Sequence, residues 1–351
     1  MDHGHFFEDF TLGQHFVHPT PRTVSDGDSA VYGALTGSRV PTHSSAVLAR
    51  TLGLRDRPLD DLLVFHIAFG KTVADISLHA RANLGYAELQ FLHPVFAGDT
   101  LSAESTVIGL KENRSSASGV VYVRSACRNQ DGLCVLRWVR WVMVHKRDAA
   151  APAPRPVLPA LAPCVPAEQL ACASQVAGAQ ALRAWCQASG SQRLWDDYAV
   201  GERIDHPCGM TLEEADHMSA TRLYQNNARV HFDALRLHQA GGQRIVYGGH
   251  VISVCRALSY DGLENVVALL AINAGQHVAP AHAGDTLYAS TRVLEKICLP
   301  GRADMGALRL RLVGLKNADP AQLADFTAPG GTRPHPAVVL DLDYVAALPR
   351  R

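Results

Sequence analysis

The chain has 351 residues, which is long for one compact core and suits two domains of similar size. Apolar residues make up 47% of it and charged residues 19%, and 33 basic residues balance 33 acidic ones. This balance offers no field that would attract nucleic acid or an anionic membrane, so we expect neither as a partner.

The eight cysteines include no Cys-x-x-Cys pair and no histidine at zinc-finger spacing, which predicts reduced thiols and no metal site. The N-terminal "MDHGHFFEDF" lacks a basic start followed by an apolar run. No later stretch approaches an uncharged apolar span of about 18 residues. We therefore expect a cytoplasmic protein.

Two parts of the sequence repeat each other. "FFEDFTLGQHFVHP" at 6–19 matches "LWDDYAVGERIDHP" at 194–207 with an offset of 188, which holds as far as His43 and His231. "PVFAGDTL" at 94–101 returns as "PAHAGDTL" at 280–287, with an offset of 186. Chance similarity would not keep this register, so the chain contains two copies of one unit.

A proline-rich stretch separates the copies. The segment 149–166, "AAAPAPRPVLPALAPCVP", holds six prolines, which remove backbone donors and favour an extended linker. The alanine-rich sequence after it could form a helix. We predict a first domain at 1–148, a linker with a possible helix at 149–190, and a second domain at 191–351.

The elements are expected in the same order in both copies. A short helix lies around 26–35 and again around 212–223. A longer helix follows, at 60–69 with an aspartate at its cap in copy one, and at 248–258, "GGHVISVCRAL", in copy two.

Strands complete each copy. The segment 119–144 is typical of a hairpin that turns at 129–132, and 306–316 with 337–345 gives the matching pair. In each copy the repeated Gly-Asp-Thr lies at the turn that begins another strand, the one that precedes the hairpin in the sequence. A central helix on an antiparallel sheet is an α+β arrangement, here in two tandem units.

The copies differ just before the aligned histidines. The segment around His43 is "YGALTGSRVPTHSS" at 32–45, and the segment around His231 is "ATRLYQNNARVHFD" at 220–233. The first resembles the signature of the MaoC-type (R)-specific enoyl-CoA hydratases, Thr-Gly-Asp-x-Asn-Pro-x-His followed by Ser or an acid. The resemblance implies the hot-dog fold, a long helix wrapped by an antiparallel sheet, and hence a double hot-dog chain. In that family an Asp and a His hold the water that adds to an enoyl thioester, and no metal is used.

Further phrases resemble a branch of this family that carries two hot-dog units in one chain, among them "GKTVADISLHARANLGYA", "DTLSAESTVIGLKEN", "YGGHVIS" and "VVLDLDY". The resemblance implies reversible hydration of an α,β-unsaturated acyl-CoA thioester that bears a free carboxylate. CoA is then part of the substrate, and no cofactor is expected.

The family residues can be placed by position. The histidine falls on His43 and His231, while the aspartate five residues earlier is replaced by Ser38 and Asn226. An amide can orient a water but cannot accept its proton. We therefore expect His231, which titrates near neutral pH, to act as the base, with Asn226 and Gln225 positioning the water.

Hydration builds negative charge on the thioester oxygen, which requires fixed backbone N–H donors. Gly248 and Gly249 follow His231 by about the interval at which these hydratases place their oxyanion glycine, and a helix start adds its positive end. A tight turn that needs glycine conformations is the alternative. In copy one the offset places Asp60 and Asp61 there, so we expect that copy, with His43, to widen the substrate pocket.

A free carboxylate on the substrate favours an arginine partner. Arg222 and Arg229 flank the "YQNNA" stretch, and Arg39 has the matching place in copy one. The alternative for each is solvated surface or an ion pair with Asp233 or Glu214.

Two other classes of function remain open. Hot-dog folds also host thioesterases, but Glu88 and Asp75 form no recognisable thioesterase pattern. Loss of the family aspartate would also suit a non-catalytic acyl-CoA-binding protein. We expect a small-molecule acyl-CoA as the partner and a homo-oligomer, most simply a dimer of chains.

Overall fold

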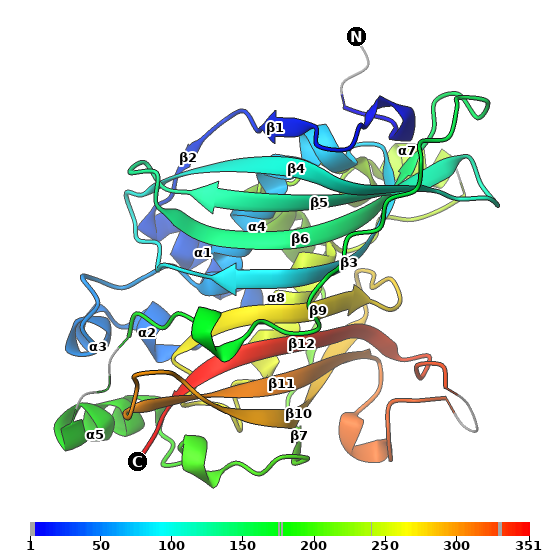
Figure 1. The fold of residues 1–351 in the computed structure, drawn as a ribbon. Coiled ribbons are helices and arrows are strands. Elements are labelled where there is room, and N and C mark those ends of the chain that lie inside the picture. Colours follow the sequence, from blue (N-terminus) through cyan, green and yellow to red (C-terminus); the bar gives the residue numbers. More distant parts are fainter. Residues whose placement is uncertain (1–3, 175, 177, 240, 329–331) are drawn as a thin grey trace.

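The computed structural model describes residues 4–174, 176, 178–239, 241–328 and 332–351 (Figure 1). The elements of the first unit are β1 (His15–Val17), β2 (Arg22–Thr23), α1 (Asp26–Thr36), α2 (Pro41–Ser44), α3 (Ala46–Thr51), α4 (Asp61–Thr72), β3 (Ala80–Phe91), β4 (Thr100–Glu112), β5 (Ser118–Arg128) and β6 (Cys134–His145). Those of the second unit are β7 (Arg203–Asp205), β8 (Met210–Thr211), α6 (Glu214–Leu223), α7 (Ala234–Gln239), α8 (Gly248–Leu258), β9 (Ala268–His277), β10 (Thr286–Cys298), β11 (Met305–Lys316) and β12 (Val338–Pro349). Between them lies α5 (Gly178–Ser189).

One continuous antiparallel sheet joins the two units. Its order is β1-β4-β5-β6-β3-β9-β12-β11-β10-β7, with β2 beside β4 and β8 beside β10. The units meet where β3 pairs with β9, for example Tyr86 with Gly275. The helices α4 and α8 lie together behind this sheet, as Figure 1 shows. The predicted α+β class, two tandem units each with a long helix against an antiparallel sheet, is confirmed.

The repeated Gly-Asp-Thr phrase forms the same turn twice. Gly98 and Gly284 have φ of 94° and 92°, a region that favours glycine. In both turns the carboxylate of the next residue accepts a backbone N–H three residues earlier, at 2.8 and 2.9 Å. Each turn leads into the strand that follows it, β4 or β10, as the duplication predicts.

Both long helices begin where the sequence indicates. The Asp60 carboxylate caps α4 by accepting the Leu62 N–H at 2.9 Å, and α8 begins at Gly248. After the first residue every position of both helices is buried, because the sheet covers one side and neighbouring helices the other. This explains why neither sequence shows a narrow apolar stripe.

A close backbone contact brings copy one to the motif of copy two. A Cβ built on Gly70 of α4 would lie 2.0 Å from the Tyr224 carbonyl oxygen and 3.2 Å from the Asn226 nitrogen. Only glycine allows this approach. The C-terminal half of α4 therefore lies beside the segment that carries Asn226.

The strands that join the units, β3 and β9, were not predicted from the sequence. In β3 the alternation is broken by three register irregularities against β6 and by a positive φ of 51° at Glu88. The hairpins β5–β6 and β11–β12 and the short helices α1 and α6 lie where they were predicted. Pairing between copies depends on contacts that local patterns do not encode.

The proline-rich linker crosses the outer face of the sheet (Figure 1). Val157 bridges to Leu110, and the Val165 N–H donates to the Asn273 side chain of β9 at 2.9 Å. The expected helix after the linker is α5. The linker therefore crosses the sheet from β4 to β9, the strand of copy two at the junction of the units.

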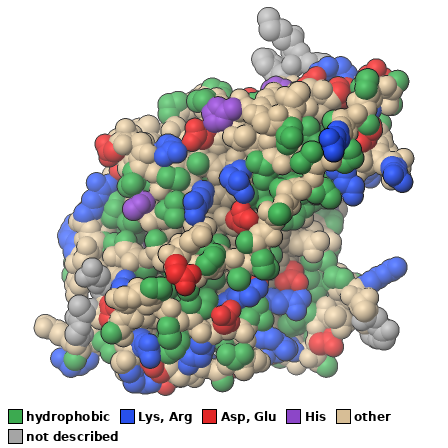
Figure 2. Space-filling model, in the orientation of Figure 1, with side chains coloured by type: hydrophobic (Ala, Val, Ile, Leu, Met, Phe, Trp, Pro, Cys, Tyr) green, Lys and Arg blue, Asp and Glu red, His purple; other side chains and the backbone are tan. Residues whose placement is uncertain are grey.

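Basic and acidic side chains are interspersed on the face shown in Figure 2, in keeping with the even charge balance of the chain. In the part of the chain that the structure describes, no helix combines the length and apolar character needed to cross a membrane.

Candidate active site

A cavity of about 270 Å³ lies between the two units, where α4, the start of α8 and the strands β3 and β9 approach one another. Copy two contributes Asn226, His231 and Gly248, and copy one contributes Phe69, Tyr86 and Arg140. Copy one thus helps to form the pocket, as expected, but through residues other than those predicted.

His231 is held as a neutral ring with one free nitrogen. Its Nδ1 lies 2.9 Å from the Ile245 carbonyl oxygen, which can only accept, so Nδ1 carries the proton. Burial lowers the pKa of His231 to about 4, which leaves the ring neutral around physiological pH. Nε2 then carries the lone pair that a base needs. This geometry suits the role predicted for His231.

Asn226 faces the cavity as a hydrogen-bond donor. The side chain is buried, and its Oδ1 accepts the Ala228 N–H at 3.0 Å, so the amide NH₂ is the group left for a ligand. It can hold a water by its oxygen without competing for the water's proton. Gln225 is exposed, with φ 54°, and belongs to the turn before Asn226 rather than to the cavity lining.

The start of α8 provides backbone donors at the cavity. The first N–H groups of a helix have no acceptor within it, and Gly248 lines the cavity, whereas Gly249 is buried beside Tyr247 and His66 and is not a lining residue. Neither Gly248 nor Gly249 has a positive φ, so the alternative of a turn that needs glycine conformations does not apply. Glycine is required by close packing instead, since a Cβ on Gly248 would lie 2.4 Å from the His277 ring.

The three predicted arginines lie away from this cavity. Arg222 and Arg229 are exposed on the surface, and Arg222 donates to the Ser219 hydroxyl at 3.3 Å. Arg39 pairs with Asp261 at 2.8 Å and is also exposed. Closeness to the motif in sequence did not turn these side chains inward, because the short segments that carry them run along the surface.

Arg140 is the buried arginine that the sequence analysis missed. It lies in β6 and lines the cavity, and the more exposed Arg81 lines it as well. The available signal was a charged residue in the middle of the apolar strand sequence "LRWVRWVMV" at 136–144. A charge in the middle of a buried strand requires a partner or a function.

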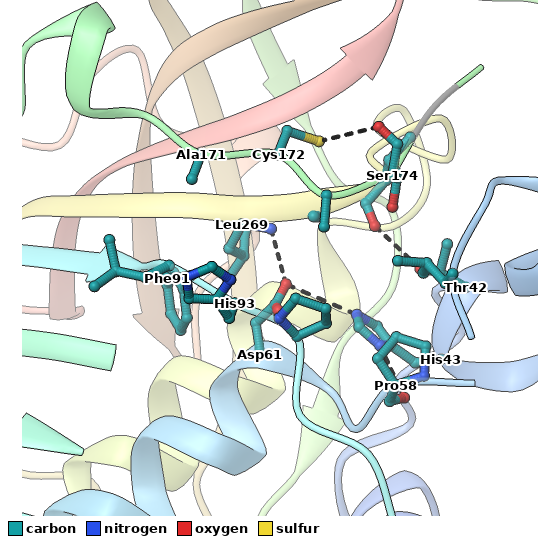
Figure 3. A pocket seen from close by; sticks show the side chains of 16 residues that line it. Thr42, His43, Pro58, Asp61, Phe91, His93, Ala171, Cys172, Ser174 and Leu269 are labelled. Carbon is teal, nitrogen blue, oxygen red and sulfur yellow. Dashed lines mark hydrogen bonds and ion pairs between the residues drawn. The ribbon is translucent and has the colours of Figure 1, made fainter. Parts of the chain in front are cut away.

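His43 and Asp61 line a second, smaller cavity of about 40 Å³, shown in Figure 3. His43 Nε2 lies 3.8 Å from Asp61 Oδ2, and the same carboxylate accepts the Leu269 N–H at 2.8 Å. Burial raises the pKa of Asp61 to about 6. Linker residues 171–174 also line this cavity, which has no lining residue in common with that of His231.

Asp60 contacts neither cavity. Its carboxylate caps α4 and accepts a hydrogen bond from the Ser38 hydroxyl at 2.9 Å. The substrate-binding role expected for His43, Asp60 and Asp61 at the His231 site therefore does not fit their positions. Their side chains are directed to the start of α4 rather than to the start of α8.

Among the described residues, no cluster of three or more His, Cys, Asp or Glu side chains could hold a metal ion. The site thus consists of a neutral histidine, an amide donor, helix-start N–H groups and a buried guanidinium around one cavity.

Comparison with known proteins defines the class. Residues 8–127 match the model of the MaoC like domain. The chain belongs to the MaoC-like dehydratase family, and its two units form a double hot-dog fold, as the sequence resemblance implied.

The relatives narrow the class further. The chain is 53% identical to Beta-methylmalyl-CoA dehydratase of Chloroflexus aurantiacus over 99% of this chain and 98% of the relative. It is 52% identical to Mesaconyl-CoA hydratase of Cereibacter sphaeroides, with the same coverage of 99% and 98%. The crystal structure of a MaoC domain protein dehydratase from Chloroflexus aurantiacus matches with a TM-score of 0.95 and 52% identity, covering 99% of this chain and 98% of that one.

Proposed function

We propose that this protein is a hydro-lyase that reversibly adds water to mesaconyl-CoA to give β-methylmalyl-CoA. The names of its full-length relatives support this substrate pair. The observation that carries the chemistry is that the free Nε2 of His231, the Asn226 amide and the start of α8 line one cavity.

The reaction begins with a water held by the Asn226 amide and His231. His231 Nε2 accepts a proton from this water while the water oxygen bonds to the β-carbon of the enoyl thioester. The electron pair of the double bond moves onto the thioester oxygen, where the Gly248 N–H at the start of α8 stabilises the charge. The proton then passes from the imidazolium to the α-carbon. One H and one OH have been added, and the ring is neutral again.

Each group has a separate contribution to the rate. A general base typically contributes about 10² to 10⁴ in rate, and an oxyanion donor about 10² to 10³. The depressed pKa of His231 makes it a weak base in the resting state, but the ring is neutral and needs no prior loss of a proton. Exclusion of water by apolar walls such as Phe69 strengthens the oxyanion contacts.

Incubation of the protein with mesaconyl-CoA tests the proposal. We expect loss of the absorbance of the conjugated thioester without release of free CoA thiol. A thioesterase would release thiol, and a non-catalytic binding protein would change neither signal. Activity on other enoyl-CoA esters but none on mesaconyl-CoA would indicate an (R)-specific hydratase for another acyl group.

The proposal includes a reaction without a metal or added cofactor, because protein groups account for proton transfer and charge stabilisation. It also includes a cytoplasmic homodimer of double hot-dog chains. One chain already contains the pair of units that single hot-dog proteins form by dimerisation, so two chains would associate through the sheet or helix surfaces that this pairing leaves exposed. Sedimentation velocity measures the mass of the particle.

A further inference from the structure

We propose that Arg140 binds the free carboxylate of the substrate and makes the enzyme selective for dicarboxylic enoyl-CoA esters. This inference rests on the proposed hydratase function and assigns the residue that distinguishes a charged acyl group from a neutral one. Arg140 lies on a strand of copy one and lines the same cavity as the motif of copy two.

Arg140 is completely buried and lines the same cavity as His231. Its Nη2 donates to the Thr72 hydroxyl at 2.8 Å and to the Thr72 carbonyl oxygen at 3.5 Å, and both Nη1 and Nη2 donate to the Ser77 hydroxyl at 3.3 Å. The guanidinium lies 4.2 Å from the centre of the Phe69 ring. Among the described residues no ion pair involves Arg140, no carboxylate contributes to the shift of its pKa, and its Nε–H has no acceptor.

A buried charge without a counter-charge costs several kcal/mol. Hydroxyl groups and an aromatic face offset only part of this cost, so an anion in the cavity would be bound strongly. A carboxylate matches the planar fork of an arginine and can accept two parallel hydrogen bonds. The protein already supplies the cavity, so the substrate can supply the missing charge.

The guanidinium keeps its charge where the enzyme works. Burial lowers the pKa of Arg140 to about 10, which is still well above neutrality, and the neighbouring Tyr86 and Tyr247 oppose the shift. The Tyr247 hydroxyl is buried, lines the cavity and has no hydrogen-bond partner among the described residues. This hydroxyl can donate a further hydrogen bond to the carboxylate that Arg140 binds.

The duplication provides an internal comparison for this position. In copy one, cross-strand pairs lead from Val107 of β4 through β5 to Arg140. In copy two, the same steps lead from Val293, 186 residues later, through β11 to Tyr344. Tyr344 is buried and uncharged. The sheet therefore does not require a charge at this point. Arg140 lines the cavity, whereas Tyr344 is not among its lining residues.

The test compares two substrates that differ only in charge at one end. Mesaconyl-CoA is compared with 2-methylbut-2-enoyl-CoA, in which a methyl group replaces the free carboxylate. We expect Arg140→Gln to lower kcat/KM for mesaconyl-CoA by about 10² to 10³, as for loss of one partner of a buried charge pair. With the neutral ester it should change by less than about tenfold, so the preference between the two collapses.

Arg137→Gln is the matched control. Arg137 lies on the same strand, donates to the Gln90 side chain at 2.8 Å and does not line the cavity, so its loss should leave the preference unchanged. Circular dichroism shows whether Arg140→Gln folds. If it does not, Arg140→Lys is tested in its place, because lysine keeps the positive charge but lacks the planar fork of donors. This variant should also lose activity on mesaconyl-CoA selectively.

The outcomes separate this inference from the proposed function. If the wild-type protein does not hydrate mesaconyl-CoA, the proposed function fails whatever Arg140 does. If the wild type is active and a folded Arg140 variant keeps the wild-type ratio between the two esters, the carboxylate is bound elsewhere and this inference is wrong.

Discussion

His43 and His231, which the 188-residue offset aligns, each place Nδ1 against a backbone carbonyl, that of Pro58 at 3.4 Å and that of Ile245 at 2.9 Å. The two rings therefore keep the same anchor after duplication. Their Nε2 atoms differ: that of His43 faces the Asp61 carboxylate at 3.8 Å, whereas that of His231 belongs to the larger cavity. What separates the two sites is the start of the helix beside each histidine, which is acidic in copy one and glycine in copy two.

Substitution of His231 and Asn226 should give different results. His231→Ala removes the only lone pair proposed to accept the proton and should lower kcat by about 10² to 10⁴. Asn226→Asp keeps a water ligand but adds a charge, so it should retain partial activity with a shifted pH profile. Steady-state kinetics with mesaconyl-CoA measures both. Near-normal turnover in His231→Ala would place the base elsewhere.

The acid limb of the pH profile of kcat/KM should lie at a lower pH than the ordinary pKa of a histidine would give. Because burial lowers the pKa of His231 from the ordinary 6.5 of a histidine to about 4, the ring stays neutral over most of the acid range. We expect kcat/KM, which reports the free enzyme, to stay level down to about pH 5 and to fall below it. An inflection near the ordinary histidine pKa, with the fold intact, would contradict the burial of the base.

The start of α8 can be tested by adding one methyl group. Gly248→Ala places a Cβ where it would lie 2.4 Å from the His277 ring, so the ring or the helix start must shift. Turnover should fall by about 10² or more, the usual loss when an oxyanion donor is misplaced. Gly33→Ala in α1 is the control, since its Cβ would meet nothing within 4 Å. Equal activity of the two variants would remove the role of Gly248.

The second cavity predicts a pH-dependent effect on stability. The pKa of Asp61 is raised from 3.8 to about 6, so the folded protein holds a proton between these values that the unfolded chain releases. Stability therefore falls as pH rises through this window, and the penalty is complete above it. Asp61→Asn can still accept the Leu269 N–H and does not titrate.

Asp61→Asn should therefore gain free energy of unfolding relative to the wild type as the pH rises from about 4 to about 7. Because 19% of the Asp61 side chain is exposed, we expect a gain of about 1 to 2 kcal/mol. Urea unfolding of both proteins at the two pH values measures it. The same difference at both values would show that this carboxyl titrates normally.

Local patterns predicted the parts of this molecule that local physics determines. The α8 sequence begins with two glycines and continues with apolar residues at helical spacing, and its predicted bounds are those observed. The Gly-Asp-Thr turn needs a glycine at positive φ, so it too is visible in the sequence. His231, Asn226 and Gly248 were expected together and line one cavity.

The substrate end of the cavity could not be predicted in the same way. Arg140 reaches it only because β3 pairs with β9 and brings copy one against copy two, which is a contact between distant segments. Arg222 and Arg229 lie beside the motif in sequence but on the surface in space. Placing a side chain in a site between units requires the pairing of strands, which periodicity does not reveal.

The most direct test of the account is to incubate the wild-type protein and His231→Ala with mesaconyl-CoA in ¹⁸O-labelled water and to analyse the CoA esters by mass spectrometry. We expect the wild type to form a β-methylmalyl-CoA that carries the label in its new hydroxyl group, and His231→Ala to form it about 10² to 10⁴ times more slowly. Unchanged mesaconyl-CoA, or free CoA with labelled mesaconate, in the wild-type reaction would contradict it.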